Sequence, residues 1–351
     1  MTALITAPSA QDLDAALREA GGLSDDSRVR EVAARPLGAG QLADSFRVEL
    51  QYAGPSGPAS VFVKMPSSDA DSAATAARIG AYERECRFYR DLLPRLDVRT
   101  PRLLGLVTGD DGDPGLVLED LSGRTRPLDQ LRDGTVEQAR SVAAQLAGLQ
   151  APFWDEEEAV GGAGLFYNRI DDHIEGLAER YLISWDKHSE TVGAGLDAAQ
   201  REMVLRFGEK VLDWAATVTG PRTLVHQDLR LDNLLWGEGG AWLVDWQTLA
   251  WTTPAWDLAF YLGSALEPEP RRQIERELVQ RHVDALHERG VRGWSHEAAW
   301  VEHRRLSGSV LLAMVAALGF VQPTERGFTM FASLVQRGAQ LAIDHDVLSF
   351  T

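Results

Sequence analysis

Six polar residues interrupt the apolar stretch Leu224–Trp236 (LVHQDLRLDNLLW), and three of them, His226, Asp228 and Asn233, are of types that would suit a reaction centre. Phosphoryl transfer to a hydroxyl needs a carboxylate that orients the hydroxyl and accepts its proton, and hard oxygen ligands for Mg²⁺. Asp228, followed five residues later by Asn233, would supply a base and a metal ligand from one loop. We expect His226 to brace the loop backbone rather than to react. The alternative is an ordinary polar turn.

A second carboxylate follows an apolar strand in Gly240–Gln247 (GAWLVDWQ). This residue, Asp245, lies 17 residues beyond Asp228 (245 − 228 = 17), close enough for the two strand ends to be neighbours. An aspartate that follows a strand indicates little by itself. Because it follows the motif H-x-D-x-x-x-x-N in the chain, however, Asp245 is predicted to be the second Mg²⁺ ligand.

A lysine and a glutamate complete the set of charged residues that could act on a nucleotide. The chain has 32 arginines but only 3 lysines, and one of these, Lys64, ends the apolar strand VFVK. A compact ammonium suits a contact to α- and β-phosphates, although the residue could also face water. Glu85 lies on the apolar face of a predicted helix, where a carboxylate is costly without a partner. We expect Lys64 to be that partner, with Arg84 or another arginine as the alternative.

Two glycines occur between the first two predicted strands, in Pro36–Ser45 (PLGAGQLADS). Gly38 and Gly40 would let the backbone come close to a ligand, and such a loop can cover nucleotide phosphates. An ordinary hairpin turn would have the same composition.

Short strands and one helix dominate the first third of the chain, and helices dominate the rest. This predicts an α+β fold with a small antiparallel-sheet lobe over residues 1–118, a junction over 119–125 and a large helical lobe over 126–351. No element is assigned to the Ser/Asp/Ala-rich stretch Ser67–Ala77. The expected strands are Val29–Pro36, Ser45–Tyr52, Ser60–Lys64, Leu103–Thr108, Gly115–Leu118, Thr223–Val225, Asn233–Trp236 and Trp242–Val244. The expected helices are Gln11–Ala20, Ala81–Leu93, Val136–Leu149, Asp171–Ile183, Asp197–Val218, Arg271–Gly290, His296–Leu318 and Gly327–His345.

Composition excludes several classes of partner. The net charge is −17, from 35 basic and 52 acidic residues, so nucleic acid is not expected. Residues 1–120 contribute −6 and residues 121–351 contribute −11, which is nearly the same charge per residue. Such evenly spread charge favours solubility over the electrostatic steering of a cationic substrate.

A single cysteine, Cys86, fits a cytoplasmic protein, and no secretion signal is recognisable. The longest uncharged stretch, Leu306–Val321, is too short to span a membrane and predicts a buried helix. The sequence gives no indication of oligomeric state.

These motifs together resemble the aminoglycoside phosphotransferase type of small-molecule kinase, and its ecdysteroid-kinase-like branch most of all. The resemblance implies a bilobal protein-kinase-like fold that uses ATP and Mg²⁺. It also implies that LVLEDL is a hinge whose backbone near Glu119 and Leu121 meets the adenine, and that Asp257 supports the catalytic loop. Gln227 departs from the pattern, since the family commonly has glycine there, and Trp-Gln follows Asp245 in place of Phe-Gly. The resembling segments are LVHQDLRLDNLLW, WLVDWQT, PAWDLAFYL, YERECRFY and LVLEDL.

The short distance from Asp245 to Asp257, 12 residues, leaves no room for a segment that docks a peptide, which favours a small substrate. Evenly spread charge favours a neutral or apolar alcohol. An aminoglycoside or other antibiotic and a hydroxyacyl thioester are the alternatives, and a catalytically silent nucleotide-binding module is the non-enzymatic one. Trp185, Trp251, Trp294 and Trp300 could line an apolar substrate pocket or belong to the core. The acidic runs Asp155–Glu158 and Asp171-Asp172 could attract a cationic substrate or simply face solvent.

Overall fold

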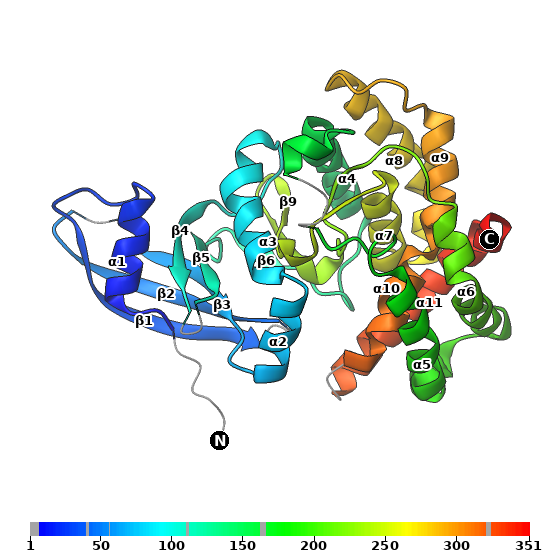
Figure 1. Ribbon diagram of the computed structural model, residues 1–351, viewed down its shortest axis with the longest axis horizontal. Helices are drawn as coiled ribbons and strands as arrows, with labels where there is room; N and C mark the ends of the chain where they lie inside the picture. Colours follow the sequence, from blue (N-terminus) through cyan, green and yellow to red (C-terminus); the bar gives the residue numbers. More distant parts are fainter. Residues whose placement is uncertain (1–6, 40–41, 56, 110–111, 162–165, 321–323) are drawn as a thin grey trace. The chain divides into compact units, whose positions relative to one another are not determined.

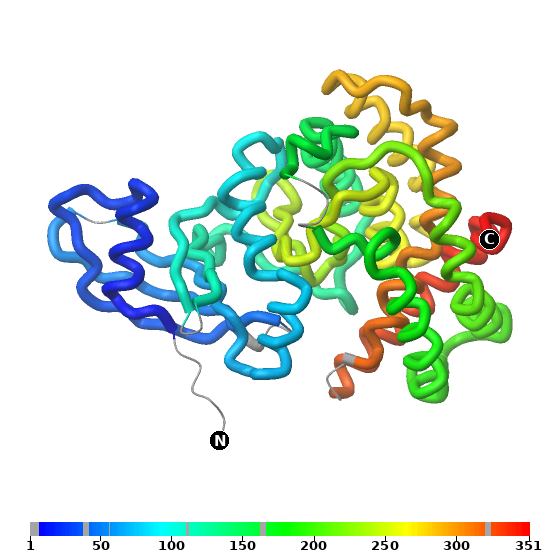
Figure 2. Tube along the Cα trace, in the orientation of Figure 1, coloured from blue at the N-terminus to red at the C-terminus, as the bar shows by residue number. Residues whose placement is uncertain are grey.

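The computed structural model describes residues 7–39, 42–55, 57–109, 112–161, 166–320 and 324–351. The chain forms two compact units, and its course between them can be followed by colour in Figure 2. The first unit consists of Met1–Arg95, Arg99–Arg126 and Val244–Thr248. The second unit consists of Leu96–Val98, Pro127–Leu243 and Leu249–Thr351.

A five-stranded antiparallel sheet forms the framework of the first unit (Figure 1). The strand order β1-β2-β3-β5-β4 places β3 between β2 and β5. In this register Lys64 of β3 lies opposite Ser45 of β2 and Leu116 of β5. All five predicted strands are confirmed. Their bounds are β1 (Arg28–Ala39), β2 (Ala43–Ala53), β3 (Ser60–Pro66), β4 (Leu103–Thr108) and β5 (Pro114–Glu119).

A small apolar core joins the sheet to the first helix. Leu13 and Leu17, four residues apart on one face of that helix, are buried in the same cluster as Val63 of β3. Gly105 of β4 permits the close approach, since an added Cβ there would lie 2.6 Å from the carbonyl oxygen of Ala16. The helices of this unit are α1 (Ala10–Glu19), α2 (Ala70–Arg78) and α3 (Ala81–Arg87).

Two helical segments of the first unit differ from expectation. α2 occupies most of the stretch without an assigned element, because the carboxylate of Asp69 caps it by accepting the backbone N–H of Ser72 at 2.9 Å. The helix expected over 81–93 is present but changes from α3 to a π-helical turn at Phe88–Leu92. In this turn Phe88 is fully buried and stacks on Trp246, with ring centroids 3.8 Å apart.

Helices make up most of the second unit, where α10 packs against α5 and α11 (Figure 1). Every residue of α7 is buried, as an apolar sequence on all sides of a helix requires. The described helices are α4 (Val136–Gln150), α5 (Ile174–Val192), α6 (Ala198–Ala216), α7 (Ala255–Ala265), α8 (Pro268–Glu288), α9 (His296–Arg305), α10 (Ser309–Ala317) and α11 (Glu325–Asp344).

Short strands fix the ends of the polar loop at residues 226–233. β7 (Thr223–Val225) precedes the loop and pairs antiparallel with β10 (Ala250–Thr252). β8 (Leu234–Gly237) follows the loop and pairs with β9 (Gly240–Leu243). β6 (Thr125–Pro127) occurs where the chain passes from the first unit to the second. The loop is therefore anchored at both of its ends by hydrogen-bonded strands.

The prediction of one continuous helix over 296–318 is wrong, because a 3₁₀ turn at Leu306–Gly308 separates α9 from α10. At the break, a Cβ on Gly308 would lie 2.4 Å from the ring of Phe207. Only glycine therefore allows the ring to pack at this position. The expected burial of the uncharged stretch is confirmed for α10. Among the described residues, none of the helices has the length and apolarity needed to cross a membrane.

Candidate functional site

Three of the predicted residues, Lys64, Glu85 and Asp245, meet inside the first unit. Nζ of Lys64 lies 2.8 Å from Oε2 of Glu85 and 2.8 Å from Oδ1 of Asp245. The Lys64 side chain is only 13% exposed, so it does not face water as the alternative would require. The predicted Lys64–Glu85 pair is therefore present, and Asp245 shares the same ammonium.

Two carboxylates keep the Lys64 ammonium charged. Burial alone would lower the pKa of Lys64, but the charges of Asp245 and Glu85 outweigh burial and hold this pKa above its ordinary value. For Glu85, burial raises the pKa and the charge of Lys64 opposes the rise. A permanently charged lysine with a fixed rotamer is what a point contact to a phosphate needs.

The segment after Asp245 is held against α3 by main-chain contacts. The second oxygen of Glu85, Oε1, accepts the backbone N–H of Trp246 at 3.1 Å. Arg84, the alternative partner for Glu85, instead donates to the carbonyl oxygen of Gln247 at 2.7 Å. Asp245 itself has a positive φ of 68°. Adjacent residues of α3 therefore fix the backbone on the C-terminal side of Asp245.

The residues predicted to meet a nucleotide through the backbone are only partly described. Gly38 belongs to β1, which runs further than expected, and Gly40 lies outside the described residues. Glu119 ends β5, and its carboxylate pairs with Arg102 at 3.3 Å and with Arg124. Leu121 is buried, and its carbonyl oxygen accepts the backbone N–H of Thr125 at 3.0 Å. That carbonyl is thus engaged in a turn.

In the second unit, Asp228 and Asn233 lie in direct contact. Nδ2 of Asn233 donates to the carbonyl oxygen of Asp228 at 2.8 Å and to its carboxylate Oδ2 at 3.0 Å. The donor side of the amide is committed to these two bonds, so its carbonyl oxygen is the atom that a cation would use. The donor set fits Mg²⁺, which prefers carboxylate and amide oxygens. The loop thus presents an aspartate and an oxygen ligand together.

A buried aspartate supports this loop, as the resemblance implied. Asp257, in the first turn of α7, accepts the backbone N–H of His226 at 2.8 Å and that of Gln227 at 2.9 Å. Burial raises the pKa of Asp257, while the imidazole of His226 and the two amide bonds oppose the rise. The expected bracing by His226 therefore includes its main-chain N–H.

Gln227 occupies a backbone position that suits glycine. Its φ is +67°, and its carbonyl oxygen accepts bonds from Nη1 of Arg169 at 2.6 Å and from Nε1 of Trp256 at 3.1 Å. The side chain is fully buried, and within the described parts of the chain neither polar atom of its amide has a hydrogen-bond partner. Two remote donors and Asp257 thus hold a conformation that an L-residue adopts at a cost.

We predict that Gln227→Gly is more stable than Gln227→Ala by about 1 kcal/mol, the reverse of the usual order. Both variants remove the buried amide, so their difference reports the backbone conformation alone. Urea unfolding of both proteins measures it. The matched control is Glu209, exposed within α6, where alanine should be more stable than glycine. If alanine were more stable than glycine at both positions, the backbone of Gln227 would not be strained.

Four residues that support the loop were missed or left without a role: Arg230, Asp232, Gln130 and Arg169. Arg230 donates to Oδ2 of Asp232 at 2.9 Å, and its Nε lies 3.4 Å from Oδ2 of Asp228. Gln130 gives its backbone N–H to Asp232 at 3.0 Å and accepts the N–H of Leu231 at 3.1 Å. The alternating charges of Asp228, Arg230 and Asp232 could have predicted that the arginine pairs with both aspartates. No such pattern indicated Gln130 or Arg169, because they lie far from the loop in sequence.

The proposed substrate-lining residues mostly belong to the core. Trp185, Trp251 and Trp294 are buried, and only Trp300 is partly exposed. The acidic run at 155–158 is exposed throughout, and Asp171 pairs with Arg222 at 3.1 Å. Neither the tryptophans nor these acidic runs define an acceptor pocket.

Comparison with known proteins gives a family match and several similar folds. The model of the phosphotransferase enzyme family matches residues 33–300. No curated protein matches the chain significantly. The three solved structures described below match with 11–16% identity, which shows the fold alone, and they confirm the predicted α+β fold of protein-kinase type.

Three of these structures illustrate the likeness. A provisionally named aminoglycoside phosphotransferase of Ralstonia eutropha JMP134 is 16% identical, with a TM-score of 0.54 and coverage of 95% of this chain and 98% of that chain. Choline kinase of Cryptosporidium parvum Iowa II is 11% identical, with a TM-score of 0.53 and coverage of 90% and 91%. The GDP complex of wild-type aminoglycoside 2'-phosphotransferase-IIIa is 16% identical, with a TM-score of 0.52 and coverage of 89% and 93%.

Proposed function

Because the chain belongs to the phosphotransferase enzyme family, we propose that it transfers the γ-phosphoryl group of ATP to a hydroxyl group of a small molecule. The observation that carries this proposal is the buried Lys64 ammonium, paired at 2.8 Å with both Glu85 and Asp245. One carboxylate can fix the lysine rotamer while the other meets a metal ion. The second carboxylate, Asp245, remains 39% exposed, which leaves its oxygens accessible to a metal ion.

In the proposed reaction each residue has a separate task. Asp228 orients the acceptor hydroxyl and takes its proton as the new bond between oxygen and the γ-phosphorus forms. The bond from the γ-phosphorus to the bridging oxygen breaks, and its electron pair leaves with ADP. Lys64 contacts the α- and β-phosphates, and Glu85 fixes the lysine rotamer. Asn233 and Asp245 would supply oxygen ligands to Mg²⁺, which would neutralise phosphate charge when bound.

Two observations favour a particular class of acceptor: the surroundings of the acidic runs and the short segment between Asp245 and Asp257. A neutral or apolar alcohol is favoured, because the acidic runs that could attract a cationic antibiotic are exposed at 155–158 or paired at Asp171. The segment between Asp245 and Asp257 contains a 3₁₀ turn, β10 and the start of α7, without an inserted element for a peptide substrate. Membership of the ecdysteroid-kinase-like branch remains part of this proposal.

The experiment that tests the function is a screen of hydroxyl compounds with ATP or GTP and Mg²⁺. Panel members are neutral alcohols, choline, aminoglycosides and hydroxyacyl thioesters. ADP or GDP release is the readout, and mass spectrometry locates the added phosphate. We expect phosphate transfer from γ-labelled nucleotide to an alcohol. Transfer to water alone would indicate a hydrolase, and no turnover across the panel would indicate a nucleotide-binding module.

Lys64→Met in the same assay should lower kcat/KM by about a hundredfold or more, because the phosphates lose their charged contact. Lys210→Met is the matched control. Lys210 lies exposed on α6 and pairs with Asp213 at 2.9 Å, so its removal should leave kcat/KM unchanged. Equal effects of the two substitutions would contradict the role given to Lys64.

A further inference from the structure

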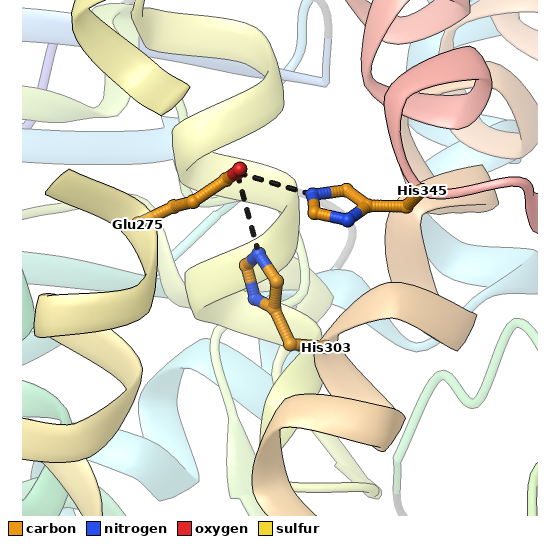
Figure 3. Close-up of side chains that lie close together, drawn as sticks. All are labelled: Glu275, His303 and His345. Carbon is orange, nitrogen blue, oxygen red and sulfur yellow. Dashed lines mark hydrogen bonds and ion pairs between the residues drawn. The ribbon is translucent and has the colours of Figure 1, made fainter. Parts of the chain in front are cut away.

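Three side chains of metal-binding types meet inside the second unit, and none of them has a part in the proposed phosphoryl transfer. Glu275 of α8, His303 of α9 and His345, which follows α11, point toward one another (Figure 3). All three are buried. One ligand atom from each can be chosen so that all three atoms lie within 4.8 Å of one another. Three separate segments thus bring together two imidazoles and a carboxylate.

The separations suit a shared cation. Oε2 of Glu275 lies 3.1 Å from Nε2 of His345 and 3.8 Å from Nε2 of His303. Ligand atoms about 2.1 Å from a tetrahedral Zn²⁺ are about 3.4 Å apart. The two observed distances lie on either side of this value. Small side-chain rotations would therefore complete the geometry.

His303 gives an independent indication of a missing partner. Its ring is 1% exposed, and within the described residues neither ring nitrogen makes a hydrogen bond. The 3.8 Å from its Nε2 to Glu275 exceeds hydrogen-bond length. The ring of Trp300 stacks on the imidazole at 5.5 Å between centroids and limits its rotation. A buried polar group held without a partner points to a water or an ion at that place.

The charge states of Glu275 and His303 are compatible with a bound cation. Burial alone would raise the pKa of Glu275, but the contacts with His303 and His345 and the charge of Arg271 hold it well below its usual range. Burial lowers the pKa of His303. An ionised carboxylate and a neutral imidazole can bind a metal ion without first losing a proton.

Arg271 opposes a cation at this place and sets the expected strength of binding. Its Nη1 donates to Oε2 of Glu275 at 2.7 Å, so a metal ion would share that oxygen with a guanidinium. Asp344 also pairs with Arg271 and neutralises part of its charge. We therefore expect micromolar affinity rather than the much tighter binding of a zinc-finger site.

We propose that Glu275, His303 and His345 bind a Zn²⁺ ion that links α8, α9 and the end of α11. Imidazole ligands favour Zn²⁺ over Mg²⁺, so this site would not compete for the magnesium of phosphoryl transfer. Three protein ligands leave one coordination position for water. The ion would stabilise the second unit without touching the reacting groups.

The test measures Zn²⁺ binding to the full chain after treatment with a chelator. Excess Mg²⁺ is present throughout, so that carboxylates of the phosphoryl-transfer residues are occupied. Calorimetry should show one Zn²⁺ per chain, and the Tm should rise. His303→Gln and His345→Gln should each weaken binding by at least about tenfold and remove most of the Tm increase. His296→Gln is the control, because His296 lies on α9 but is exposed and pairs with Asp284 at 2.7 Å.

Two results would overturn the site: no saturable binding of Zn²⁺, or binding that His303→Gln and His345→Gln leave unchanged. If either variant does not fold, Co²⁺ added to the unmodified chain decides the question. Intense visible absorption of tetrahedral Co²⁺ with nitrogen and oxygen ligands supports the proposal. A weak octahedral spectrum, or none, rejects it.

Discussion

Replacing Asp228 by asparagine should lower the kcat of phosphoryl transfer by about a thousandfold and leave the nucleotide Kd within about threefold. The amide oxygen of the new side chain can still accept the bond that Asn233 gives to Oδ2 at 3.0 Å, and it can still face Nε of Arg230 at 3.4 Å. The loop should therefore keep its geometry. What is lost is the ability to take a proton from the acceptor hydroxyl. Steady-state kinetics and nucleotide binding by calorimetry measure the two quantities.

Asp232→Asn is the matched control, because it removes the same charge from the same loop. Asp232 pairs with Arg230 at 2.9 Å and has nearly the same side-chain exposure as Asp228, 23% against 20%. It also accepts the backbone N–H of Gln130, which its amide oxygen can still do. Its kcat should fall by less than about tenfold. If Asp228→Asn retained a tenth of the activity, or if both variants lost the same amount, Asp228 would not be the base.

The predictions that the structure confirms are those in which one local pattern places a residue. Helical spacing put Glu85 on an apolar face, where a carboxylate needs a cationic partner, and the structure shows that this partner is Lys64 rather than Arg84. Alternation placed the first two strands of the first unit, and short apolar runs beside turns placed the other three. The two ends of the polar loop were likewise marked by apolar residues that form β7 and β8.

The features that sequence did not predict depend on contacts between distant segments. A 3₁₀ turn at Leu306–Gly308 interrupts the helix expected over 296–318, where the ring of Phe207 packs against Gly308, and no pattern within the helix shows this. Gln130 reaches the polar loop from 101 residues away and Arg169 from 58. The cluster of Glu275, His303 and His345 comes from three segments whose local sequences look ordinary. Such partners are selected by three-dimensional packing, which hydrophobic periodicity does not encode.

Gln227 shows how one departure from a family pattern is tolerated. A positive φ favours glycine, yet the loop retains glutamine there because both its N–H and its carbonyl oxygen are bonded to remote groups. The partners in these bonds are Asp257 and Arg169, so the loop conformation depends more on these two supporting residues than on the residue at position 227. Loss of a support should therefore have a larger effect than a change at Gln227 itself.

Replacing Asp257 by alanine should consequently lower both stability and activity. Two buried N–H groups, of His226 and Gln227, would lose their acceptors, which costs about 3 kcal/mol or more in the free energy of unfolding. The kcat should fall by about a hundredfold, because Asp228 would no longer be held in position. Nucleotide KM should change much less, since Asp257 acts only through the loop backbone. Thermal unfolding and steady-state kinetics provide the two measurements.

Asp257→Asn separates the anchoring role from the charge. One amide oxygen can accept one of the two backbone bonds, while the –NH₂ group would face the other N–H and oppose it. Because burial raises the pKa of Asp257, the neutral side chain also recovers part of the desolvation cost. The asparagine variant should therefore lie between the unmodified chain and the alanine variant in Tm and in kcat. Asp284→Asn, at an exposed position of α8, is the control and should match the unmodified chain. Full activity in the alanine variant would show that the loop holds Asp228 without this support.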